Sequence, residues 1–178
     1  AISSIYNNIG NVYKAQLNYN TALEYYQRAI NILKQQDKID QQGLADIYYS
    51  IAITEFALNN YNKTLLITNN HLENSHPDTK LYFLSLKAAS LIELNKKTEA
   101  YKSYNEVIEY AKNYYSDNDP NLIFEYINFA TFLIDINNFQ EAKIVLDKIS
   151  AMLSEANIEE GENLALYYRA LGWYYENL

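Results

Sequence analysis

The side chains that could bind a metal ion are few and unfavourably spaced. The only two histidines, His71 and His76, are five positions apart, and no third ligand is evident beside them. A zinc site needs several convergent ligands. Asp117 and Asp119 begin like a calcium-binding loop, but Pro120 follows them, and no glycine or closing glutamate is correctly spaced to complete such a loop. We therefore predict that the chain holds no metal ion.

Catalytic chemistry has equally little support. The chain has no cysteine, which excludes a thiol nucleophile, a disulfide and a thiolate zinc site. Its four glycines form no phosphate-binding loop, and no nucleophile motif is present. Glu155, Glu159, Glu160 and Glu162 could bind a cation, but we favour a solvated helix start, where the helix dipole stabilises negative charge. We expect a protein that is not an enzyme and needs no cofactor.

Charge and hydropathy exclude two further classes of partner. The net charge of −8 disfavours nucleic acid, whose phosphates are neutralised by Lys and Arg. It also disfavours an anionic membrane surface. No apolar run approaches the roughly 20 residues of a membrane span, and no signal peptide is visible. We expect a cytoplasmic protein that binds neither nucleic acid nor membranes.

Small residues recur along the chain at a fixed interval. Two sets keep the same offset of 12 positions in every complete repeat, and the members of the first set are separated by 42, 36, 42 and 42 residues. The first set is Gly10, Ala52, Ala88, Ala130 and Gly172, and the second is Ala22, Thr64, Ala100 and Ala142. Large apolar residues surround each small residue at three- and four-residue steps, which indicates one face of a helix. A small residue there lets a second helix approach closely, so each unit is a helix pair that must stack on the next.

The segment from Ile5 to Ile30 resembles a tetratricopeptide repeat, whose pattern is a large aromatic residue, Leu-Gly, Tyr, Ala, an aromatic residue and Ala. The fourth and fifth repeats match almost as well. The resemblance implies an all-α fold, a right-handed α-solenoid of antiparallel helix pairs with about nine helices. The second repeat departs most: it has Glu55, Thr68 and His71 where the first has Tyr13, Tyr26 and Ala29.

The predicted elements form a single array over residues 1–178. Intervals of 42 exceed the usual period of about 34, as in the extended repeats of kinesin light chains and many bacterial sensor and signalling proteins. We expect repeats near 3–40, 45–78, 81–118 and 123–160, then a first helix of a fifth repeat at 163–178. First helices are predicted near 3–17, 41–58, 78–94, 120–136 and 160–177, and second helices near 20–37, 61–74, 97–115 and 139–155.

The resemblance also implies a binding surface, because the first helices of such arrays line a concave groove. The offsets of groove positions from the small residue place Ser4 and Asp46 there, together with our twelve candidate binding residues. These are Asn7, Asn11, Lys14, Tyr49, Ile53, Phe56, Tyr82, Phe124, Ile127, Thr131, Arg169 and Trp173. Asn7 and Asn11 lie one turn apart and could hydrogen-bond the N–H and C=O groups of an extended peptide. Alternatively, the apolar positions fill a tight superhelix by packing on one another.

Two functions remain once catalysis is set aside. A scaffold that binds a protein or peptide is our main hypothesis, and a ligand-sensing region of a larger bacterial signalling protein or protease is the alternative. Chaperone-tail binding is disfavoured, because only Asn11 fits the clamp of Lys and Asn that such domains use. The last helix, 163–178, is apolar and has no second helix to cover it. We expect either a piece of a longer protein or self-association through this helix.

Overall fold

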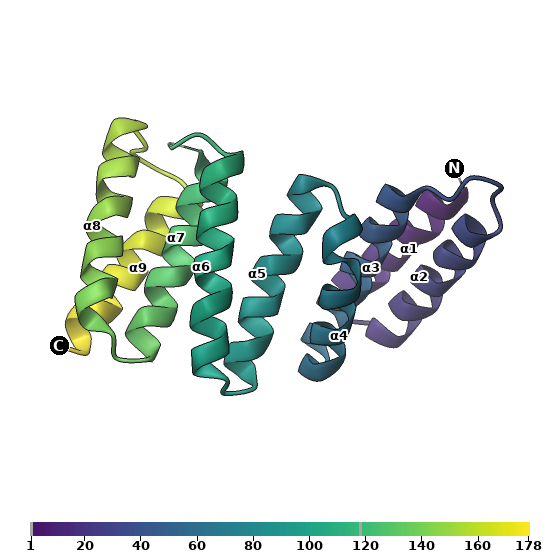
Figure 1. The fold of residues 1–178 in the computed structure, drawn as a ribbon, viewed down its shortest axis with the longest axis horizontal. Coiled ribbons are helices and arrows are strands. Elements are labelled where there is room, and N and C mark those ends of the chain that lie inside the picture. Colours follow the sequence, from purple (N-terminus) through teal and green to yellow (C-terminus); the bar gives the residue numbers. More distant parts are fainter. Residues whose placement is uncertain (1, 118) are drawn as a thin grey trace. The chain divides into compact units, whose positions relative to one another are not determined.

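The computed structural model describes residues 2–117 and 119–178, which form nine α-helices and no β-strand (Figure 1). The all-α prediction is confirmed, and each predicted helix is found within a few residues of its expected bounds. The helices are α1 (Ile2–Ala15), α2 (Tyr19–Lys34), α3 (Gln41–Ala57), α4 (Tyr61–His71), α5 (Pro77–Glu93), α6 (Lys97–Tyr114), α7 (Pro120–Asp135), α8 (Phe139–Glu155) and α9 (Glu162–Glu176). A short 3-10 helix, η1 (Leu72–Asn74), extends α4.

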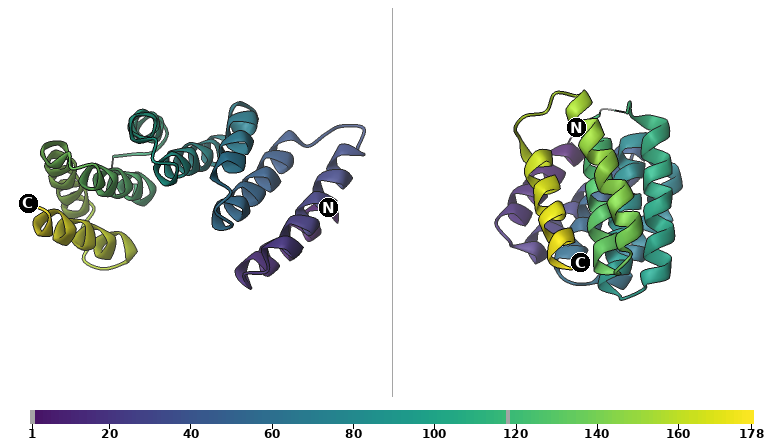
Figure 2. Two further views of the ribbon diagram at one scale, coloured as in Figure 1. Left: turned by 90° about the horizontal axis from the view of Figure 1, so that it is seen from below. Right: turned by 90° about the vertical axis from the view of Figure 1, so that its left-hand side faces the viewer.

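The chain forms two compact units, Ala1–Ser103 and Tyr104–Leu178. In the first unit, α1 and α2 form one antiparallel hairpin and α3 and α4 a second (Figures 1 and 2). The first helices also contact one another directly, α1 with α3 and α3 with α5. They therefore form one layer of this unit, and residues at equivalent positions of the repeats lie on one surface.

In the second unit, α7 pairs with α8, and α9 packs against both (Figure 2). The core of this unit lies around α7, where Ile123, Ala130 and Leu133 are completely buried. Tyr104 of α6 stacks on Phe132 with ring centroids 5.1 Å apart. Burial raises the pKa of the Tyr104 hydroxyl, and the nearby carboxylates of Glu125 and Asp135 add to the effect.

The repeated small residues lie where the paired helices approach most closely. All the alanines of both sets, together with Thr64, are 0% exposed. At Gly10, a Cβ atom added to the backbone would lie only 2.5 Å from Cε1 of Tyr26 on α2. The prediction of close helix approach is confirmed for the paired helices. At Gly172, in the last helix, a Cβ meets no atom of the described chain within 4 Å, as expected for a first helix without a second helix to cover it.

The turns between paired helices share a conformation that the sequence analysis did not identify. Leu17, Asn59, Asn95 and Asn137 all have a φ between 56 and 62°, in the left-handed region. They are separated by 42, 36 and 42 positions, which is the repeat interval. The next residue in each case donates its N–H to a carbonyl five positions back, as in the bond of 2.9 Å from Asn18 to Tyr13. Such a bond closes a helix C-terminus, and Asn is one of the few residues that tolerate this φ. The recurring Asn was the signal that could have revealed it.

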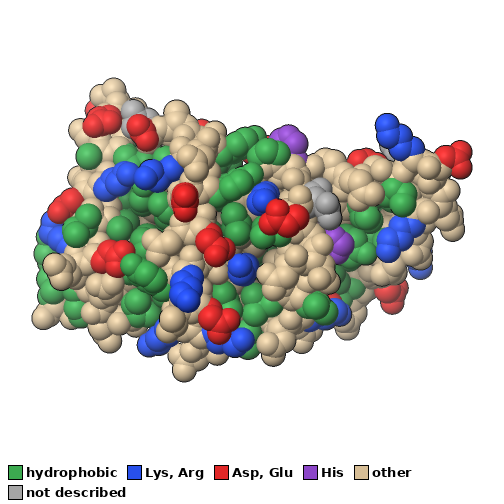
Figure 3. Space-filling view, viewed as in Figure 1, with side chains coloured by type: hydrophobic (Ala, Val, Ile, Leu, Met, Phe, Trp, Pro, Cys, Tyr) green, Lys and Arg blue, Asp and Glu red, His purple; other side chains and the backbone are tan. Residues whose placement is uncertain are grey.

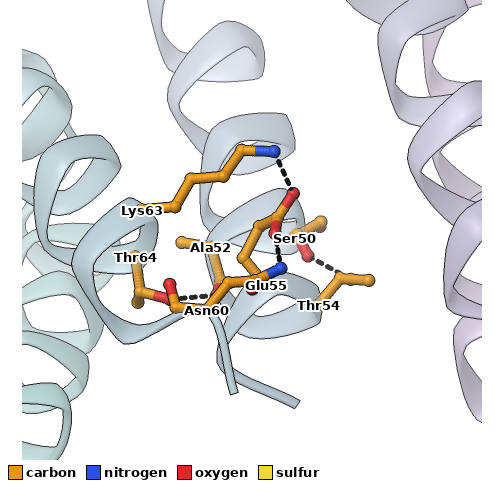
Figure 4. Close-up of polar contacts among 7 residues, drawn as sticks. All are labelled: Ser50, Ala52, Thr54, Glu55, Asn60, Lys63 and Thr64. Carbon is orange, nitrogen blue, oxygen red and sulfur yellow. Dashed lines mark hydrogen bonds and ion pairs between the residues drawn. The ribbon is translucent and has the colours of Figure 1, made fainter. Parts of the chain in front are cut away.

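The second repeat keeps the fold despite its unusual residues. Glu55 is 1% exposed and lies between α3 and α4 (Figure 4). One carboxylate oxygen lies 2.6 Å from Nζ of Lys63, and the other accepts a hydrogen bond of 2.8 Å from Nδ2 of Asn60. A buried charge is tolerated when it is paired and hydrogen-bonded in this way. His71 stacks on Tyr48 with ring centroids 3.6 Å apart, so polar pairing and stacking replace the tyrosine packing of the first repeat.

Candidate functional site

Three of the predicted binding residues lie on α1, and each has a different environment. The side-chain oxygen of Asn11 accepts a hydrogen bond of 2.8 Å from the hydroxyl of Tyr26, so this amide supports the α1–α2 pair. Oδ1 of Asn7 is buried and has no hydrogen-bond partner within the described chain. Burial lowers the pKa of Lys14. Although Asn7 and Asn11 share a helix face, only the side-chain oxygen of Asn7 is left without a hydrogen bond from a described residue.

A small pocket of about 90 Å³ lies beside Asn7, between α1, α2 and α3. It brings together three positions that the sequence places in the groove, Ser4, Asn7 and Asp46. The other lining residues were not predicted, because they come from the start of α1, from α2, from the loop before α3 and from positions of α3 outside the predicted groove set. The full lining is Ser3, Ser4, Asn7, Leu33, Asp40, Gly43, Asp46 and Ile47.

Hydrogen bonds fix the two carboxylates of this pocket. Oδ1 of Asp46 accepts bonds from Nε2 of Gln42 at 2.8 Å and from Oγ1 of Thr79 at 2.9 Å, which ties α3 to the start of α5. The same Gln42 accepts a bond of 2.8 Å from the backbone N–H of His76. Asp40 caps α3 by accepting a bond of 2.9 Å from the backbone N–H of Gly43. Both carboxylates are therefore held in place by the fold.

Aromatic residues form the neighbouring surface on α3 and α5. Tyr49 stacks on Tyr82 with ring centroids 5.4 Å apart and an interplanar angle of 22°. Tyr49 also contacts the buried Phe83 edge-on, with ring centroids 5.5 Å apart. Tyr82 remains 42% exposed. The stacked pair therefore has a rigid base in the core and leaves one aromatic ring exposed on the surface.

The other two predicted residues of α3 continue along the same helix. Phe56 is half-buried and packs edge-on against Tyr61, with ring centroids 5.3 Å apart. Ile53 is also half-buried. These side chains are only partly accessible, so Tyr82 is the most exposed of the predicted aromatic residues in this unit.

The predicted residues of the second unit differ widely in exposure. Phe124 and Trp173 are each 40% exposed, and Arg169 is also exposed. Ile127, by contrast, is only 2% exposed, and its carbonyl accepts a hydrogen bond of 2.9 Å from the hydroxyl of Thr131. Ile127 contributes to the core of this unit, whereas Phe124, Arg169 and Trp173 are accessible.

The face of α9 that carries the repeat pattern is open. Tyr168 and Tyr175 correspond to Tyr6 and Tyr13, which stack on Tyr25 of α2 in the first repeat. On α9 both tyrosines are 60% exposed. Within the described residues no helix covers this face, which explains the free space at Gly172.

Charged side chains do not gather into a patch of one sign on the face shown in Figure 3. On the face shown in Figure 3, acidic and basic side chains are interspersed over each unit. In the described part of the chain, no group of three or more His, Asp or Glu residues is placed to hold a metal ion. None of the described helices combines the length and apolarity needed to cross a bilayer.

Comparisons with known proteins agree with this architecture. Residues 1–65 match a family model described as tetratricopeptide repeat. A crystal structure of a Podosopora anserina putative kinesin light chain with nearly identical TPR-like repeats has a TM-score of 0.75 at 13% identity, covering 98% of this chain and 89% of that one. A search of the curated proteins found no match. The predicted resemblance to tetratricopeptide repeats is confirmed.

Two other solved structures have the same fold. The apo form of RapI has a TM-score of 0.79 at 11% identity, with 99% of this chain and 63% of that chain covered. YrrB, described as a TPR protein with an unusual peptide-binding site, has a TM-score of 0.57 at 14% identity, with 97% and 84% covered. At these identities the likeness concerns the fold alone.

Proposed function

We propose that this chain, whose residues 1–65 match the tetratricopeptide repeat and whose fold is that of TPR-like proteins, is a module that binds a protein or peptide partner. The partner would lie against the layer of first helices, which is the surface formed by α1, α3 and α5 in the first unit. The description of YrrB as having a peptide-binding site supports a peptide as the ligand class.

The observation that carries this proposal is the stack of Tyr49 and Tyr82 on α3 and α5. An exposed ring that is fixed from below by stacking loses little conformational freedom when a partner covers it. Rigid aromatic side chains of this kind often supply most of the binding energy of an interface. The half-buried Ile53 extends the apolar surface on α3.

A selection of binders from a displayed random-peptide library tests this proposal. Peptides selected on the whole chain would be titrated against wild type, Tyr82→Ala and Leu66→Ala. Leu66 is the matched control, because it is an apolar side chain on the second helix α4 and is 61% exposed. We expect Tyr82→Ala to weaken binding about tenfold or more, as for an interface hot spot. Peptides that tolerate Tyr82→Ala but lose binding to Leu66→Ala would contradict the proposal.

We further propose that α9 supports association between two copies of the chain. The open face formed by Tyr168, Gly172 and Tyr175 has the same residue types as the face that α1 buries against α2. Two tyrosines on either side of a glycine allow a helix to approach closely. In a symmetric dimer the same surface of both copies forms the interface, so α9 of one copy would pack on α9 of the other.

A further inference from the structure

We infer that the pocket between α1, α2 and α3 binds the cationic head group of a lysine or arginine side chain of the partner. This deepens the proposed function, on which it rests, by naming the chemistry of the ligand. The pocket would take ligands that carry an ammonium or guanidinium group on an aliphatic stem. Four features of the pocket support the inference: its carboxylates, its unpaired buried amide oxygen, its apolar walls and its size.

The pocket presents two carboxylates without a basic partner. Asp40 and Asp46 both line it, and in the described part of the chain neither forms an ion pair with Lys or Arg. Their hydrogen bonds come from neutral donors, namely Gly43 N–H, Gln42 and Thr79. Ionised carboxylates only accept hydrogen bonds. A ligand that donates several hydrogen bonds and carries positive charge therefore complements them best.

One further polar atom at the pocket is buried without a partner. Oδ1 of Asn7 is inaccessible to solvent and accepts no hydrogen bond from any described residue. The hydroxyl of Ser3, which also lines the pocket, forms no hydrogen bond within residues 2–117 and 119–178. Buried polar groups are nearly always hydrogen-bonded, so each exception requires an explanation. A bound donor would satisfy the Asn7 oxygen and could also bond the Ser3 hydroxyl.

The size and the walls of the pocket restrict the ligand. A volume of about 90 Å³ admits a single head group with part of its stem. The apolar walls are supplied by Leu33 and Ile47, and each of these residues is 3% exposed. Lys and Arg side chains suit such a site, because their aliphatic stems pack on apolar surface while the charged end reaches polar groups. The net charge of −8 also favours the approach of a cation.

Nuclear magnetic resonance titration of the whole chain tests this inference. The probes are n-butylammonium and n-butylguanidinium, with n-butanol as the neutral control. We expect saturable shifts of the amide signals of Ser3, Asn7 and Asp46 with at least one of the cations, and weaker binding at high salt. The double variant Asp40→Asn/Asp46→Asn should lower the affinity about tenfold or more, because it removes both charges. Asn preserves the helix cap at position 40, and circular dichroism checks the fold.

Three outcomes would overturn the inference. These are the absence of saturable shifts with either cation, equal shifts with n-butanol, or an unchanged response in the double variant. A library-selected peptide with its Lys and Arg residues replaced by norleucine distinguishes a peptide side chain from a free amine as the ligand. If that replacement leaves peptide affinity unchanged while the free cations still bind, the pocket accepts a small amine and the inference of a partner side chain is wrong. Peptide binding that depends on Tyr82 would survive such a failure, so the two proposals can fail separately.

Discussion

The Tyr26 ring on α2 lies so close to Gly10 on α1 that a Cβ atom at position 10 would be 2.5 Å from Cε1 of that ring. The neighbouring atom Cδ1 would be 2.7 Å away. Tyr26 cannot move aside easily, since it is 0% exposed and its hydroxyl is bonded to Asn11. At this position the first repeat therefore has no room for the Cβ atom of an alanine.

Gly10→Ala should therefore destabilise the protein by about 1–3 kcal/mol, the usual cost of overpacking a core. Gly10→Leu should unfold the first repeat. Gly172→Ala is the matched control, because it is also inside a helix but has free space around it. At protein concentrations too low for association between copies, it should stabilise the monomer by roughly 0.5–1 kcal/mol through helix propensity. Urea unfolding measures both, and a destabilising Gly172→Ala would show that the face of α9 is covered in solution.

Leu17→Asn should stabilise the protein by up to about 1 kcal/mol. Leu17 has a φ of 61°, a conformation that costs most L-residues energy. Its side chain is 71% exposed, so little packing is lost on replacement. The reverse change, Asn95→Leu, has the same backbone context, with a φ of 56°, and should destabilise. The midpoint temperatures of thermal unfolding of both variants test this prediction. Shifts of the two midpoints in the same direction would contradict it.

Lys63→Ala should destabilise by about 2–3 kcal/mol, because it leaves the Glu55 carboxylate buried without its cation. The loss is expected to be below that of a fully buried pair, since Lys63 itself is largely exposed. In a Glu55→Gln background, the same Lys63→Ala change should cost much less. A double-mutant cycle by urea unfolding gives the coupling. Equal losses in the two backgrounds would mean that the ion pair makes no contribution.

His71 should make stability depend on pH. Burial lowers its pKa below the ordinary value of 6.5, and the positive charge of Lys34 lowers it further. The unfolded chain then binds a proton more readily than the folded chain, so stability falls as the pH drops through 6.5 toward the folded pKa. His71→Gln should remove this part of the pH dependence.

His76→Gln is the control for that experiment, because His76 lies on the exposed surface beside Asp78. Urea midpoints of wild type and both variants would be compared between pH 7.5 and 5. As the pH falls across this range, the urea midpoint of wild type should decrease more than that of His71→Gln. If only His76→Gln altered the profile, the role assigned to His71 would be wrong.

The double variant Tyr168→Ser/Tyr175→Ser should abolish association between copies. Both residues are 60% exposed, so their replacement should leave the monomer folded. Size-exclusion chromatography with light scattering would measure the mass over a range of concentrations. Wild type is expected to show a concentration-dependent dimer. A strictly monomeric wild type at high concentration would contradict self-association.

The repeat fold was predictable because its determinants are local and periodic. The alternation of small and large residues identifies the faces of α1 and α7 without any knowledge of distant contacts. The turn residues Asn59, Asn95 and Asn137 recur at the same repeat interval and carry the same information. Helix existence depends on neighbours three or four positions apart, and these are visible in one sequence.

Tertiary contacts decided which predicted groove residues are available. Asn7 and Asn11 are the same residue type and lie one turn apart on α1. Only Asn11, however, accepts a hydrogen bond from a tyrosine hydroxyl of α2. Likewise, Phe124 is exposed and Ile127 is buried on the same helix. The pocket beside Asn7 combines residues of three elements, including Leu33 and Asp40. Side-chain availability depends on the packing of separate helices, which a periodic pattern along one chain does not specify.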